Sequence, residues 1–80
     1  MRVLLADDSE LILDALHEIL QAVDQVEIVA SCKNGTDALA SLRRLKPDLA
    51  IVDLKMPGLT GLEVLTEIRN EGITTKFIQI

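Results

Sequence analysis

Three aspartates stand directly behind short apolar segments, and their carboxylates are the groups in this chain best suited to chemistry. Asp7 and Asp8 follow the apolar residues 3–6, and Asp53 follows the apolar residues 49–52. Clustered carboxylate oxygens suit a hard divalent cation such as Mg²⁺, which takes one or two carboxylates and keeps several waters. A carboxylate beside such a cation can also act as the nucleophile that forms an aspartyl-phosphate. Asp53, alone at the end of its segment, is the best candidate acceptor.

The elements that would position these aspartates begin with a strand and a helix. Residues 3–6 are continuously apolar, which is typical of a parallel strand buried on both faces. Ser9 is a plausible N-cap for a helix that follows. Positions spaced by one, three and four residues predict that this helix presents one wide apolar stripe to the core. The stripe consists of Leu11, Ile12, Ala15, Leu16, Ile19, Leu20 and Val23.

The remaining segments continue the alternation of strand and helix. Residues 26–32 alternate and are rich in β-branched side chains, which predicts a second strand, and Asn34-Gly35 is a turn signal. We expect a second helix over residues 36–45, a third strand over 49–52 and a loop over 54–59. Thr60 and Glu63 form the pattern of a capping box for a third helix that ends near Gly72. A fourth strand is predicted from residue 76.

This order predicts an α/β fold with a parallel sheet and right-handed crossovers. We expect three layers and the flavodoxin-like strand order 2-1-3-4. In such a sheet the first and third strands are neighbours, about 4.8 Å apart. Ligands bind beyond the carboxyl ends of the strands where the strand order reverses, which is at this pair. Asp7, Asp8 and Asp53 should therefore converge.

The sequence resembles the receiver domain of two-component response regulators, whose fold is called CheY-like. The resemblance rests on Asp7-Asp8, on Asp53 and on Met56-Pro57-Gly58-x-x-Gly61, and the predicted elements stand in the family's order over residues 1–80. The stretch from Leu59 to Leu65 is most similar to the transcription-factor branch that carries a helix-turn-helix output domain.

The resemblance implies specific roles for the acidic residues. It implies that Asp53 is the phosphoacceptor in a reaction that needs Mg²⁺ or Mn²⁺. It implies metal ligands from Asp8 and Asp53, from Asp7 largely through water, and from the backbone carbonyl of Lys55. The phosphoryl donor would be a sensor histidine kinase or a small phosphodonor. A receiver of this kind is a signalling domain that catalyses only its own phosphorylation and dephosphorylation.

The resemblance also implies that a complete receiver has five strands and five helices. We therefore expect residues 1–80 to form the first two thirds of the domain, without helix 4, strand 5 and helix 5. The output domain would lie outside this chain. An apolar edge from Phe77 to Ile80 should then be exposed, and we expect self-association or poor stability of the isolated chain.

Composition narrows the possible partners. The formal net charge is −5, which disfavours direct contact with nucleic acid or with an anionic membrane surface. The apolar run before Asp7 is too short for a signal sequence or a membrane span. The single Cys32 cannot form an internal disulfide, and together these features indicate a cytoplasmic protein.

Two other functions compete with the phosphoacceptor. A phosphatase of the haloacid-dehalogenase type needs an acid/base aspartate two residues after its nucleophile, where this chain has Lys55. The second alternative is a receiver-like interaction fragment without phosphoryl chemistry. Mg²⁺ titration at Asp8 and Asp53 would separate this alternative from the phosphoacceptor.

Overall fold

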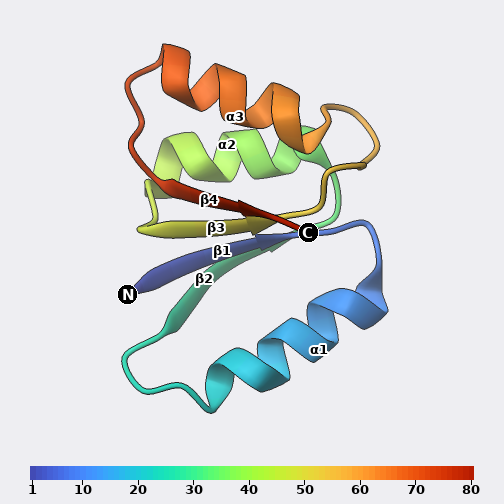
Figure 1. Cartoon of the computed structure of the whole chain (residues 1–80), viewed down its shortest axis with the longest axis vertical. Coiled ribbons are helices and arrows are strands. Elements are labelled where there is room, and N and C mark those ends of the chain that lie inside the picture. The colour runs from blue at the N-terminus through green and yellow to red at the C-terminus, as the bar shows by residue number, and fades with distance from the viewer.

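The computed structural model describes all residues from Met1 to Ile80 and contains four strands and three helices in strict alternation. The elements are β1 (Arg2–Ala6), α1 (Glu10–Gln21), β2 (Glu27–Cys32), α2 (Gly35–Leu45), β3 (Leu49–Val52), α3 (Gly61–Asn70) and β4 (Lys76–Gln79). All strand pairs are parallel, and the sheet has the order β2-β1-β3-β4. The predicted flavodoxin-like α/β fold is confirmed. Figure 1 shows α2 and α3 on one face of the sheet and α1 on the other.

The core is much larger on the face that α2 and α3 cover. Twelve buried residues form one cluster there, with Leu4 and Val52 from the sheet meeting Leu42 of α2 and Ile68 of α3. The cluster on the opposite face has three buried residues, Val3, Leu5 and Leu13. The three-layer arrangement is therefore asymmetric, and most apolar burial holds α2 and α3 in place.

The side of α1 that meets the sheet differs from the prediction. Leu11, Ile12 and Ile19, predicted as core, are 77%, 40% and 63% exposed. The buried residue is Leu13, at 4% exposure, which the predicted stripe omits. The reason is geometric, because apolar side chains cover about half of this helix and the sheet can contact only part of that arc. The rest of the predicted stripe, Ala15, Leu16, Leu20 and Val23, is half-buried or exposed.

The helix starts follow the predicted capping signals with one correction. The Ser9 side chain caps α1, and Thr60 and Glu63 form a complete capping box on α3. Asn34 and Gly35 were predicted to form a turn, but Asn34 is the N-cap of α2 and Gly35 is its first residue. Asn34 can play this part because its side chain accepts a backbone N–H from the first turn of the helix.

β4 forms one edge of the sheet, and its apolar side chains are incompletely covered. Ile78 and Ile80 are 48% and 54% exposed, and Phe77 is half-buried. The predicted exposed apolar edge is confirmed, and self-association through it stays a prediction. No helix in the structure has the length and apolar character that a bilayer span requires.

Candidate functional site

β1 and β3 end side by side, and an aspartate follows each of them. Ala6 is paired with Val52 at the last position of the two strands. The Asp53 N–H then donates to the Ala6 carbonyl at 2.8 Å, and the Asp7 N–H donates to the Cys32 carbonyl of β2 at 3.0 Å. The inter-strand hydrogen bonds therefore continue one residue beyond the strands. They fix the backbone of both aspartates at the carboxyl end of the sheet, which we call the acidic edge.

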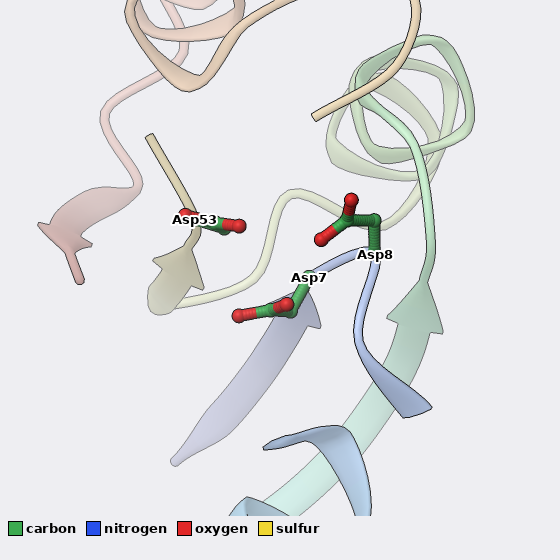
Figure 2. Close-up of side chains that lie close together, drawn as sticks. All are labelled: Asp7, Asp8 and Asp53. Carbon is green, nitrogen blue, oxygen red and sulfur yellow. The ribbon is translucent and has the colours of Figure 1, made fainter. Parts of the chain in front are cut away.

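The side chains of Asp7, Asp8 and Asp53 come together at this edge. One carboxylate oxygen from each residue lies within 4.8 Å of the other two. Figure 2 shows the three side chains reaching from the ends of β1 and β3 toward a common space. Asp7 is only 5% exposed, Asp53 is half-buried and Asp8 is exposed. The predicted convergence of the three aspartates is confirmed.

Backbone amides orient two of these carboxylates. The Ser9 N–H donates to Asp7 Oδ1 at 2.8 Å, in the turn that leads into α1. The Lys55 N–H donates to Asp53 Oδ1 at 3.3 Å. These bonds restrict the rotation of both side chains, and each leaves a second carboxylate oxygen available. The part played by the Ser9 amide was not predicted, because the sequence indicated only a capping side chain there.

No basic side chain neutralises the cluster. The ion pairs of the chain join Lys33 to Glu10 and Arg43 to Glu67 and Glu71, and none includes one of the three aspartates. The buried carboxylate of Asp7 thus lies beside two other carboxylates and forms no ion pair with a basic side chain. Mutual repulsion at this range favours a bound cation. The donor atoms are all oxygen, which fits Mg²⁺ or Mn²⁺ and does not fit soft metals.

The loop after Asp53 is anchored in the hydrophobic core by Met56. Met56 is 7% exposed and belongs to the main core cluster, as expected for a packing residue rather than a metal ligand. The Lys55 side chain is exposed, and no protein group donates a hydrogen bond to its backbone carbonyl. This carbonyl is therefore available as a further oxygen ligand, which is the part that the resemblance assigns to it.

A glycine at the start of α3 also contributes to the site, in a way that the sequence motif did not explain. The Gly61 N–H donates to the Leu54 carbonyl at 3.1 Å. A Cβ atom on Gly61 would lie 2.6 Å from the Asp53 carbonyl oxygen. The glycine thus permits α3 to begin in contact with the backbone of Asp53.

The largest hollow in the surface is not at the aspartates. It has a volume of about 670 Å³ and is lined by residues that include Lys46, Asp48, Glu71 and Lys76, at the opposite end of the strands. Its charged side chains are of both signs, and they include no group of three possible metal ligands. The one cluster of carboxylates that could hold a metal ion is Asp7, Asp8 and Asp53, at the carboxyl end of the strands.

Comparisons with known proteins agree with this geometry. The family model "Response regulator receiver domain" matches residues 3–80. The chain is 37% identical over 65 residues to the transcriptional regulatory protein BtsR of Salmonella typhi, covering 81% of the chain and 27% of that protein. It is 36% identical over 70 residues to the transcriptional regulatory protein DesR of Bacillus subtilis, covering 88% of the chain and 35% of that protein.

Solved structures give the same assignment. The signal receiver domain of NarL from Mycobacterium tuberculosis superposes with a TM-score of 0.94 at 28% identity, over 98% of this chain and 63% of that chain. A DNA-binding response regulator of the LuxR family from Staphylococcus aureus gives 0.92 at 35% identity, over 98% and 65%. The chain thus spans about a third of the curated relatives' length and about two thirds of these solved chains.

Proposed function

Because the chain belongs to the response-regulator receiver family of two-component systems, we propose that it accepts a phosphoryl group on Asp53. The donor is the phosphohistidine of a sensor kinase or a small acyl phosphate. The observation that carries the proposal is the approach of the three carboxylates to within 4.8 Å of one another. In this proposal residues 1–80 are part of a receiver domain that regulates an output domain, and the output domain binds DNA.

Asp53 is the acceptor because of its setting among the three aspartates. Asp7 is buried and bound to the Ser9 amide, whereas Asp53 is half-buried at the tip of β3. The Lys55 amide holds Asp53 Oδ1 and leaves Oδ2 to attack the phosphorus. The new bond is the P–O bond of an acyl phosphate. The P–N bond to the donor imidazole breaks, and its electron pair stays on that nitrogen, which takes a proton from solvent.

The oxygen cluster is the metal site of this proposal. Asp7, Asp8, Asp53 and the backbone carbonyl of Lys55 would hold Mg²⁺ or Mn²⁺, in accord with a donor set that is all oxygen and has no cationic side chain. When bound, the cation neutralises charge on the phosphoryl oxygens. The chain's own contribution is to hold the carboxylates at one edge and to keep Asp53 oriented through the Lys55 amide.

The kinase-binding surface of this proposal is the exposed apolar side of α1. α1 begins directly after the acidic pair, and Leu11 and Ile19 are 77% and 63% exposed. An exposed apolar patch of this kind marks a protein interaction site, and it suits packing on a helical bundle.

Two-component signalling of this type runs in the cytoplasm, where reducing conditions keep a thiol such as Cys32 free. The net charge of −5 leaves DNA contact to the output domain.

The acceptor is tested with a labelled acyl phosphate and Mg²⁺. The unmodified protein should take up label that is stable in acid and labile in base, and Asp53→Asn should take up none. Asp24→Asn is the matched control, because it removes the same charge from an exposed turn. Label that persists in Asp53→Asn would remove Asp53 as the acceptor. A protein that takes no label and shows no Mg²⁺ response at Asp8 would instead be an interaction module.

The partner surface is tested separately from the acceptor. Leu11→Ser with Ile19→Ser should slow transfer from a kinase while transfer from an acyl phosphate stays unchanged. Leu62→Ser is the control, because Leu62 is 59% exposed on α3, on the other face of the sheet. Equal slowing by the control variant would show that the apolar side of α1 is not specific for the kinase.

A further inference from the structure

The loop that carries Asp53 and Lys55 lies against the start of α2, far away in sequence. The Gly35 N–H donates to the Pro57 carbonyl at 3.1 Å, and Gly35 is buried. A Cβ atom on Gly35 would lie 1.8 Å from the Leu59 carbonyl oxygen and 2.6 Å from its carbon. This space is closed to any other residue, since such a contact is with backbone rather than with a movable side chain.

A second contact joins the same two segments from the side of the loop. Gly58 has a φ of 78°, in the left-handed region that favours glycine. A Cβ atom there would lie 2.9 Å from Thr36 Oγ1. Two adjacent residues of α2, Gly35 and Thr36, thus lie in close contact with the loop between β3 and α3.

We propose that Gly35 is a positioning residue for the acidic site, acting through the backbone of the loop between β3 and α3. The inference rests on the proposed function for its consequence in phosphoryl transfer. A side chain at position 35 pushes the Leu59 carbonyl away from α2. Leu59 directly precedes Thr60, the N-cap of α3, so the displacement reaches the first residues of that helix.

The displacement is passed on to Asp53 because the loop has little freedom elsewhere. Met56 is held in the core at 7% exposure. The Gly61 N–H donates to the Leu54 carbonyl, and Gly61 packs so close to Asp53 that a Cβ atom would lie 2.6 Å from the Asp53 carbonyl oxygen. A shift of the α3 start therefore moves the backbone of Asp53 and the amide of Lys55, which orients Asp53 Oδ1. Misplacement of a reacting group by about 1 Å can cost about 100-fold in rate.

The experiment compares Gly35→Ala with Gly72→Ala. Gly72 has a φ of 77° and open space around it, at the far end of α3, so its substitution strains the backbone without touching the loop. Amide NMR signals of Asp53 and Lys55 are recorded in the folded protein without metal, and Mg²⁺ is then titrated. For Gly35→Ala these signals should shift, and the Mg²⁺ dissociation constant should rise about tenfold, which corresponds to about 1.4 kcal/mol.

These readouts separate positioning from stability, because signals of the folded state do not depend on the unfolded fraction. Unchanged amide signals of Asp53 and Lys55 in Gly35→Ala would overturn the proposal, and so would equal shifts in Gly72→Ala. If the unmodified protein accepts no phosphoryl group, the proposed function fails, but the amide comparison still decides whether Gly35 positions the loop.

A double-mutant test decides the question if Gly35→Ala does not fold. Gly58→Ala pushes the loop from its own side, and Thr36→Ala removes the hydroxyl that it meets. The shift of the Asp53 amide caused by Gly58→Ala should be smaller when Thr36→Ala is also present. Equal shifts in the two backgrounds would mean that contact with α2 does not position the loop, and the proposal would fall.

Discussion

Asp8 is the exposed member of the acidic cluster, and its replacement by asparagine should stabilise the protein in the absence of a divalent cation. The carboxylate oxygens lie within 4.8 Å of one another, and two unit charges at that distance repel each other by about 1 kcal/mol in a water-like dielectric and about 3–4 kcal/mol at an effective dielectric of about 20. Asp8 is exposed and lies near the first limit. Because Asp7 and Asp8 also repel each other in the unfolded chain, the interaction with Asp53 sets the net gain. Asp8→Asn should therefore raise the free energy of unfolding by about 1 kcal/mol.

The assay is thermal and urea unfolding in a chelating buffer at low salt. A gain of about 1 kcal/mol raises Tm by about 4–8 °C in a domain of this size. Glu18→Gln is the control, since Glu18 is exposed on α1 and makes no ion pair. The advantage of Asp8→Asn should shrink in about 1 M salt, where the screening length is about 3 Å.

Saturating Mg²⁺ should reverse the ranking of the two proteins. A cation at about 100 times its dissociation constant stabilises the folded state by about 2.7 kcal/mol, and Asp8→Asn lacks one ligand and gains less. The repulsion argument is refuted if Asp8→Asn stabilises the metal-free protein no more than Glu18→Gln does. It is also refuted if the gain from Asp8→Asn is unaffected by salt.

Three further outcomes follow from side chains outside the acidic cluster. The Thr75 hydroxyl is buried and donates to the Pro47 carbonyl at 2.6 Å, so Thr75→Val should cost about 1–3 kcal/mol in urea unfolding, while Thr75→Ser should cost less. The hydrogen bond from Arg43 lowers the pKa of Glu71 below its ordinary 4.5. Its stabilising effect is therefore present above pH 4.5 and lost as the pH falls through the lowered pKa, and Glu71→Gln should flatten this part of a stability–pH curve. Burial raises the pKa of the Cys32 thiol, so alkylation near pH 8 should be slow until denaturant is added.

The sheet and the acidic cluster could be predicted because local patterns determine them. Continuously apolar segments that each end in aspartate define parallel strands whose tips meet, whatever the details of side-chain packing. Asp7 and Asp53 are therefore neighbours because the strands that they follow, β1 and β3, are paired in the sheet. The capping box of Thr60 and Glu63 is local in the same sense, since all of its partners lie within one turn.

The details that could not be predicted depend on contacts between distant segments. A helix with apolar residues over half its circumference does not show which part meets the sheet, and so Leu13 was missed while Leu11 was placed in the core. Gly35 was interpreted as a turn residue from its neighbour Asn34. Its actual constraint is the Leu59 carbonyl, which only the folded chain brings near.

The unequal division of the core has a consequence for how the molecule opens. α1 is attached through a buried cluster of three residues, whereas α2 and α3 share a cluster of twelve. Amide protons of α1 should therefore exchange with solvent through a local opening of lower free energy than those of α2 and α3. The helix that follows the acidic pair is thus the easiest of the three helices to rearrange, and a partner that packs on it can adjust the segment bearing Asp7 and Asp8 without disturbing the larger core.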